Sequence, residues 1–162
     1  MSDAAAEIER LYRAHGHLVL RRARALLGSD PDAHEALQEV FAALVRAPET
    51  LAGLRSAVGW LYQATTHHCL KQLRDRRTGA RILERHAAGP GPGPEGARGE
   101  AAAELRSLLA LLPEEEAAAL VYHHLDGMSQ AEVAELLGCS RRKVGYLLER
   151  AEGHLRREER TA

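Results

Sequence analysis

An alternating run of glycine and proline, Gly89-Pro-Gly-Pro-Gly-Pro94, interrupts the chain a little past its midpoint. Proline lacks a backbone N–H and glycine is the most flexible residue, so this run cannot lie inside a helix or a strand. Two more glycines follow closely, and we predict a Gly/Pro-rich linker over 87–100. The linker would divide the 162 residues into two small domains, 1–86 and 101–162.

Apolar residues on both sides of this linker recur at steps of three and four, the spacing of one helix face. The pattern predicts helices from Ala5 to Leu27 and up to about Ala47, with Asp30 as the N-cap of the second. Residues expected on the inward faces include Tyr12, Leu18, Phe41 and Val45. Because only six residues are aromatic while Ala, Leu, Glu and Arg abound, we predict an all-α fold.

A third helix is expected to begin near Ser56 and to continue into a basic run at 71–85. Val58 and Leu61 lie on its apolar side, whereas Trp60 lies on the other side, in line with the first cations of the run. An aromatic residue beside cations on a polar face suits stacking on an unpaired base and neutralisation of phosphates. Capping of the hydrophobic core is the alternative role for Trp60, and both remain open.

The second domain has the pattern of a helix-turn-helix. Ser129-Gln-Ala-Glu132 is spaced as a capping box, and Gly138-Cys-Ser140 is spaced as a tight turn before the last helix. That helix begins with Arg141-Arg-Lys143, three cations that each oppose the helix dipole at a cost of about 0.3–1 kcal/mol. Stability alone would not place them there, so we infer a surface for phosphates and base edges; a tolerated surface charge is the alternative.

Several functional classes are disfavoured by the residues present. No nucleophile has an obvious base partner and no glycine loop is followed by a phosphate-binding helix, so we do not expect an enzyme. Adjacent histidines on a helix point about 100° apart and cannot readily share an ion, so we expect no metal and no cofactor. No apolar stretch could span a bilayer and the first residues are not a signal peptide, so we expect a cytoplasmic chain without membrane insertion.

The overall charge of −1 conceals an uneven distribution. Residues 1–88 carry a net charge of +3, whereas residues 113–162 carry −3. The basic run at 71–85 can therefore serve as a local footprint for phosphates, although it can also be a solvated helix end.

Three segments match short patterns of one protein family, in the order found in that family. Asp30-Pro-Asp-Ala-His-Glu-Ala-Leu-Gln-Glu-Val-Phe41 resembles the pattern D-x-x-D-A-E-D-L-x-Q-E-V-F of the sigma factors of bacterial RNA polymerase. The segment from Trp60 to Arg74 is similar to the promoter-melting segment of the extracytoplasmic function (ECF) group, W-L-x-x-I-A-x-N-x-C-L-D-x-L-R. Residues 112–138 and the helix after them resemble the second DNA-binding domain of that group.

The resemblance implies an initiation factor that binds core RNA polymerase, recognises two promoter elements and melts the one nearer the start site. It implies that the second helix docks on the β′ clamp helices through Asp32, Glu35, Gln38, Glu39 and Ala42, and that the second domain meets the β flap. The residues expected to contact upstream duplex DNA are Ser140, Arg141, Arg142, Lys143, Tyr146 and Arg150. Those expected to contact the melted strand are Trp60, Gln63, His67, Lys71, Arg74, Arg76 and Arg77. Anti-sigma factors are common partners in this group and would cover both kinds of surface.

Departures from the family pattern leave two rival functions open. His67 stands where many relatives have Asn, Lys71 where many have Asp, and Gly145-Tyr-Leu147 where many have Lys-Ser-Arg. One rival is a sigma-like interaction protein without promoter activity. The other is a helix-turn-helix repressor, which leaves the first domain unexplained.

Overall fold

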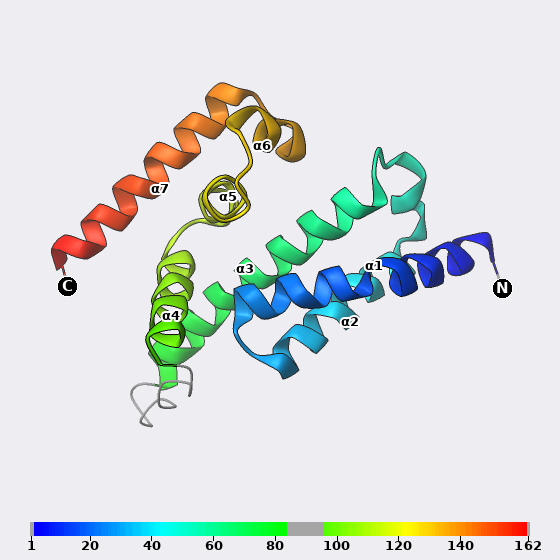
Figure 1. Cartoon of the computed structure of the whole chain (residues 1–162), viewed down its shortest axis with the longest axis horizontal. Coiled ribbons are helices and arrows are strands. Elements are labelled where there is room, and N and C mark those ends of the chain that lie inside the picture. The colour runs from blue at the N-terminus through cyan, green and yellow to red at the C-terminus, as the bar shows by residue number, and fades with distance from the viewer. Residues whose placement is uncertain (1, 84–95, 162) are drawn as a thin grey trace. The chain divides into compact units, whose positions relative to one another are not determined.

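The computed structural model describes residues 2–83 and 96–161, and every regular element within these ranges is helical (Figure 1). This confirms the all-α fold class. The elements are α1 (Asp3–Leu27), α2 (Asp30–Arg46), the 3-10 helix η1 (Pro48–Gly53), α3 (Ala57–Leu83), α4 (Gly96–Leu111), α5 (Glu114–Leu120), the π-helix η2 (Val121–Leu125), α6 (Gln130–Leu137) and α7 (Arg141–Thr161). The Gly/Pro run at 89–94 lies outside the described residues.

The chain divides into two compact units, 1–69 and 70–162. The boundary between the units falls within α3, whereas the boundary predicted from the sequence falls in the linker. The predicted bounds of the two domains and of the linker therefore remain predictions.

In the first unit, α1 and α2 pack against each other around one apolar core. Its buried members are Ile8, Leu11, Val19, Leu37, Val40, Phe41, Leu44 and Leu61. Phe41 is only 6% exposed, which confirms its expected place in the core. Leu61 comes from α3, so the three longest segments of this unit share one core.

The start of α2 differs from the sequence prediction by one residue. Gly28 ends α1 with a left-handed φ of 68°, and Ser29, not Asp30, is the N-cap of α2. The Ser29 hydroxyl accepts a hydrogen bond from the Asp32 backbone N–H at 3.4 Å. Ser29 has an extended backbone, as an N-cap requires, while Asp30 is already helical and places its charge in the first turn.

Four residues that were expected on inward faces are exposed instead. Tyr12, Leu18, Val45 and Val58 are 48%, 41%, 65% and 41% exposed. On each of these helices, the apolar stripe in the sequence is wider than the part of the helix surface that neighbouring elements cover, so these four residues stay exposed. Tyr12 still places its ring edge-on against Phe41, with 5.0 Å between the ring centroids.

In the second unit, α7 packs against α5 and α6. The buried faces combine small and branched side chains, namely Ala117, Ala118, Ala119, Val133, Val144, Leu147, Leu148 and Ala151. The predicted capping box at the start of α6 is confirmed, because the Ser129 hydroxyl accepts from the Glu132 N–H at 3.1 Å and the Glu132 carboxylate accepts from the Ser129 N–H at 3.1 Å.

The helix after the linker begins earlier than the sequence suggested. α4 starts at Gly96, so residues 96–100, which were assigned to the linker, are helical. The alanine-rich stretch that follows has a high helix propensity and extends the helix backwards across Gly96 and Gly99.

Candidate functional site

α6 and α7 are joined by a three-residue turn. Gly138 adopts a left-handed φ of 68°, and the Cys139 N–H donates to the Ala134 carbonyl at 3.0 Å. The Ser140 hydroxyl then accepts a hydrogen bond from the Lys143 N–H at 3.0 Å. Ser140 is therefore the N-cap that fixes where α7 begins, which is the geometry predicted for the helix-turn-helix.

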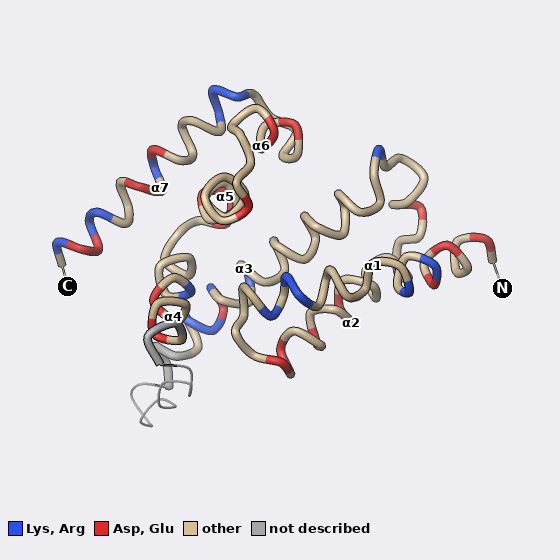
Figure 2. The backbone as a smooth tube through the Cα atoms, in the orientation of Figure 1, with Lys and Arg blue, Asp and Glu red and all other residues tan. Residues whose placement is uncertain are grey.

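The first turn of α7 is a cluster of exposed cations (Figure 2). Arg141, Arg142 and Lys143 are all exposed, and within the described residues no ion pair holds the first two. The Lys143 Nζ lies 3.9 Å from the Glu115 carboxylate of α5, a surface pair that contributes little to stability. The cations are thus available to a partner of opposite charge.

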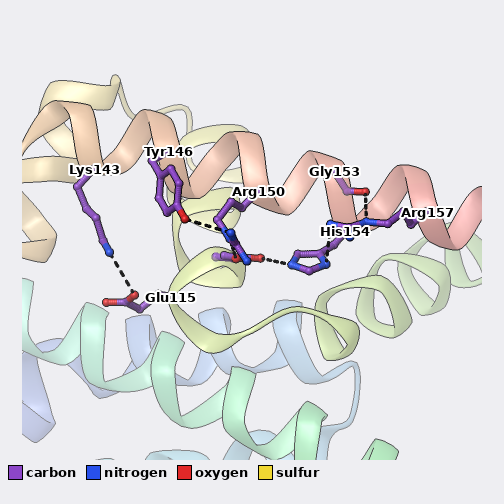
Figure 3. A network of polar contacts seen from close by, with 8 residues as sticks. Glu115, Lys143, Tyr146, Arg150, Gly153, His154 and Arg157 are labelled. Atoms are coloured by element: carbon purple, nitrogen blue, oxygen red, sulfur yellow. Dashed lines mark hydrogen bonds and ion pairs between the residues drawn. The ribbon is translucent and has the colours of Figure 1, made fainter.

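Two further residues expected to contact duplex DNA take part in a polar network within the unit. The Arg150 Nε donates to Glu116 Oε1 at 3.2 Å, and the Arg150 Nη1 donates to the Tyr146 hydroxyl oxygen at 3.0 Å. The His154 Nε2 lies 3.4 Å from Glu116 Oε2. Tyr146, Arg150 and His154 follow one another along one side of α7 (Figure 3).

Glu116 is the residue at this site that the sequence did not reveal. It follows two other acids, Glu114 and Glu115, at the start of α5, yet it is only 4% exposed. The hydrogen bond that Arg150 donates to the Glu116 carboxylate, followed by the one that it donates to the Tyr146 hydroxyl oxygen, raises the pKa of Arg150. The one available signal was position, because Glu116 lies three residues before the fully buried Ala119 and thus on the inward side of α5.

On α3, the residues assigned to the melted strand differ in exposure. Trp60 is half-buried and packs against the core of the first unit, as does Ala64. Gln63 and His67 are half-buried as well. Farther along the helix, Lys71, Arg74 and Arg76 are exposed and Arg77 is half-buried. Trp60 therefore has a core-facing part and an accessible part, which fits either of the two roles left open for it.

Arg22 of α1, which the sequence did not single out, contacts two residues of α3. The Arg22 guanidinium of α1 lies 3.8 Å from the centroid of the Tyr62 ring, and its Nε donates to the Thr66 hydroxyl oxygen at 2.6 Å. Tyr62 and Thr66 are one turn apart on α3. These two contacts, together with Leu61 in the core, hold one side of α3 against the rest of the first unit.

On α2, the residues assigned to polymerase binding lie off the buried face. Glu35, Gln38 and Glu39 are exposed, and Asp32 and Ala42 are half-buried. The Arg46 guanidinium donates to the Glu39 carboxylate at 2.8 Å, and this hydrogen bond and charge lower the pKa of Glu39. Gln38 and Glu39 therefore lie outside the apolar core of the first unit.

Two adjacent histidines, His123 and His124, lie at the end of η2. The His123 and His124 rings meet edge-on at 4.7 Å, and the His123 Nδ1 is 2.7 Å from the Met128 carbonyl oxygen. No group of three or more potential metal-binding side chains occurs in the part of the chain that the structure describes.

Among the described helices, none is both long and apolar enough to cross a membrane.

Comparison with known proteins gives two family matches and a similar fold. Residues 11–78 match the family description of Sigma-70 region 2, and residues 102–155 match that of Sigma-70, region 4. A solved structure of the sigma factor RpoE in complex with the anti-sigma factor NepR, from Bartonella quintana, has a similar fold. Its TM-score is 0.54 at 14% sequence identity, over 93% of this chain and 95% of that chain. No curated protein sequence matches the chain.

Proposed function

Because the chain belongs to the sigma-70 family, we propose that it is a member of the ECF group and that its described surfaces divide the tasks of promoter recognition, strand opening and polymerase binding. The chain is a transcription initiation factor that directs RNA polymerase to promoters, with core polymerase and promoter DNA as its partners. Sigma factors are non-enzymatic transcription factors. We therefore propose that this chain acts by binding energy alone and needs no cofactor.

Recognition of upstream duplex DNA is proposed for the start of α7. The observation that carries the proposal is the exposed cluster of Arg141, Arg142 and Lys143 on the first turn of a capped helix after a helix-turn-helix turn. Backbone N–H groups at a helix start and cationic side chains together attract phosphates, and Arg can read a guanine edge in the major groove.

Capture of the melted strand is proposed for α3. Trp60 offers the accessible part of its ring for stacking, and His67, Lys71 and Arg74 follow it at helical spacing. Stacking on an unpaired base becomes available only after strand separation, so this face favours the open state over the closed one. Gln63, Arg76 and Arg77 complete the proposed set.

Polymerase binding is proposed for the exposed side of α2. Gln38 and Glu39 lie outside the core, so a partner can contact them without unfolding the unit. We assign this side of α2 to the β′ clamp helices and the second domain to the β flap. Core polymerase and chromosomal DNA lie in the bacterial cytoplasm, which is where we expect the chain to act.

An anti-sigma factor is a further proposed partner. The structure that resembles this fold holds a sigma factor bound to the anti-sigma factor NepR. A partner of that class would compete with polymerase and DNA for the surfaces described above.

Run-off transcription with purified core polymerase on genomic fragments tests this function. We expect discrete promoter-specific products that require both the chain and core. Products that core forms equally well alone would contradict the proposal and favour a sigma-like interaction protein. Tight, sequence-specific duplex binding by the chain without polymerase would favour a repressor instead.

A further inference from the structure

Two basic side chains on one side of α7, Arg150 and His154, contact the Glu116 carboxylate. Its side chain is 5% exposed, while those of its partners Arg150 and His154 are 51% and 32% exposed. A buried carboxylate is costly unless it is paired, so Glu116 strongly constrains the position of the Arg150 guanidinium. About half of the Arg150 side chain is exposed, while the buried Glu116 carboxylate holds its guanidinium in place.

The constraint continues from Arg150 to Tyr146. The Arg150 Nη1 donates to the Tyr146 hydroxyl oxygen at 3.0 Å, so this oxygen acts as an acceptor within the protein. A phenol oxygen that accepts one hydrogen bond keeps its own hydrogen to donate. The Tyr146 side chain is 50% exposed on the second turn of α7, one turn after the cations of the first.

Cations also flank the Tyr146 ring. The Lys143 Nζ lies 5.8 Å and the Arg150 guanidinium carbon 5.5 Å from the ring centroid. Both distances lie within the range of cation–π attraction, which holds the ring between residues one turn before and one turn after it. The ring and the hydroxyl are therefore oriented before any ligand arrives.

We propose that Glu116 and Arg150 are positioning residues that orient Tyr146 as a hydrogen-bond donor to an acceptor on duplex DNA. This inference rests on the proposed function of α7. The acceptors that fit a single O–H donor are a phosphate oxygen or, in the major groove, a purine N7, guanine O6 or thymine O4. Arg150 thus acts through Tyr146: its charge is balanced by the Glu116 carboxylate at 3.2 Å, so it adds no net positive charge toward a phosphate.

A double-mutant cycle on the full chain with core polymerase tests this chain of contacts. The probe is a duplex selected from a randomised pool by the wild-type holoenzyme, with a scrambled duplex as reference. Tyr146→Phe keeps the ring and removes the donor, and we expect it to weaken binding by about three- to tenfold. Glu116→Gln should have a similar effect alone and little further effect in the Tyr146→Phe background.

Controls separate positioning from general stability. Glu104→Gln makes the same change at an exposed acid of α4 and should leave affinity unchanged. Additive effects of Glu116→Gln and Tyr146→Phe would overturn the inference. A loss on the selected duplex alone identifies a base edge as the acceptor, and an equal loss on both duplexes identifies a phosphate.

Salt dependence gives a readout that does not depend on the folding of Glu116→Gln. A lost phosphate contact lowers the salt slope of binding by about one. We expect Arg142→Met to lower the slope in this way and Arg150→Met to leave it unchanged while weakening affinity. A lower salt slope for Arg150→Met would overturn this inference and leave the proposed function of α7 standing. If the wild-type holoenzyme selects no sequence, the proposed function fails and the inference fails with it.

Discussion

The Thr66 hydroxyl connects two helices: its oxygen accepts a 2.6 Å hydrogen bond from the Arg22 Nε of α1, and its hydrogen is donated to the Tyr62 carbonyl of α3 at 2.9 Å. Thr66 is fully buried. One hydroxyl thus satisfies a charged donor and a backbone acceptor at once, and it holds the face of α3 that we assign to the melted strand in a fixed orientation.

Replacement of Thr66 by valine, which has nearly the same shape, should destabilise the protein. Loss of a hydrogen bond to a buried or charged partner costs about 1–3 kcal/mol. Thr78→Val is the matched control, because Thr78 is exposed and, among the described residues, its hydroxyl donates only to the Arg74 carbonyl of its own helix. Urea unfolding measures both variants. Equal loss of stability in the two would show that the Arg22 contact contributes nothing.

The Cys69 thiol should be inert in the folded protein. Burial raises its pKa to about 12 against the slight lowering by the Arg22 charge, so almost no thiolate forms near neutral pH. Cys139 is half-exposed and should react first with a thiol reagent. Reaction of two thiols at similar rates without denaturant would contradict this setting, and Cys139→Ser identifies the slower one.

The same shift predicts how stability depends on pH. Because the folded-state pKa of Cys69 lies above the ordinary thiol value of 9.0, its contribution is present below pH 9 and is lost as pH rises toward 12. Urea unfolding across this window should show a smaller decline in Cys69→Ala than in the wild type. Parallel declines would contradict the shift.

Substitutions at Ser140 can separate the effect of the helix cap on stability from the proposed binding of α7 to DNA. Ser140→Ala removes the cap and should cost about 1 kcal/mol of unfolding free energy. Ser140→Asp keeps a cap and suits the helix dipole, but it places a negative charge beside the cations of the first turn. We therefore expect Ser140→Asp to unfold like the wild type in urea and to bind duplex DNA more weakly by anisotropy. Unchanged DNA affinity would remove the start of α7 from the interface.

The proposed binding of core polymerase by the exposed side of α2 can be tested without DNA. The double variant Gln38→Ala with Glu39→Ala should weaken association with core polymerase by about fivefold or more and leave thermal unfolding nearly unchanged. Glu9→Ala is the control, since it also removes the acid of an exposed pair, with Arg13 at 2.7 Å. Core affinity equal to that of the control in a titrated pull-down would show that another surface docks on polymerase.

The helices were predictable because their signals are local. Apolar spacing, Gly28 and the Ser129–Glu132 capping box lie within a turn or two of the boundaries that they set. The family resemblance could be recognised for a related reason, since its patterns are short stretches of contiguous residues.

The polar network at α7 was not predictable, because its members lie far apart in the chain. Glu116 and Arg150 are separated by 34 positions, and only their packing explains why one acid of three is buried. Val45 is the opposite case, an apolar residue in a helical pattern that remains 65% exposed because no neighbouring element covers it within the described structure. Spacing along the sequence shows which residues lie on the same face of a helix. Tertiary packing decides how much of that face neighbouring elements cover.

Strand opening at a promoter is the most direct test of the account, and permanganate footprinting measures it through the oxidation of unpaired thymines. The DNA is a promoter fragment identified by run-off transcription. We predict reactive thymines near the start site only when the chain and core polymerase are both present, and fewer of them with Trp60→Ala than with the wild type at equal DNA occupancy. Thymines that stay unreactive with both proteins bound would contradict the account.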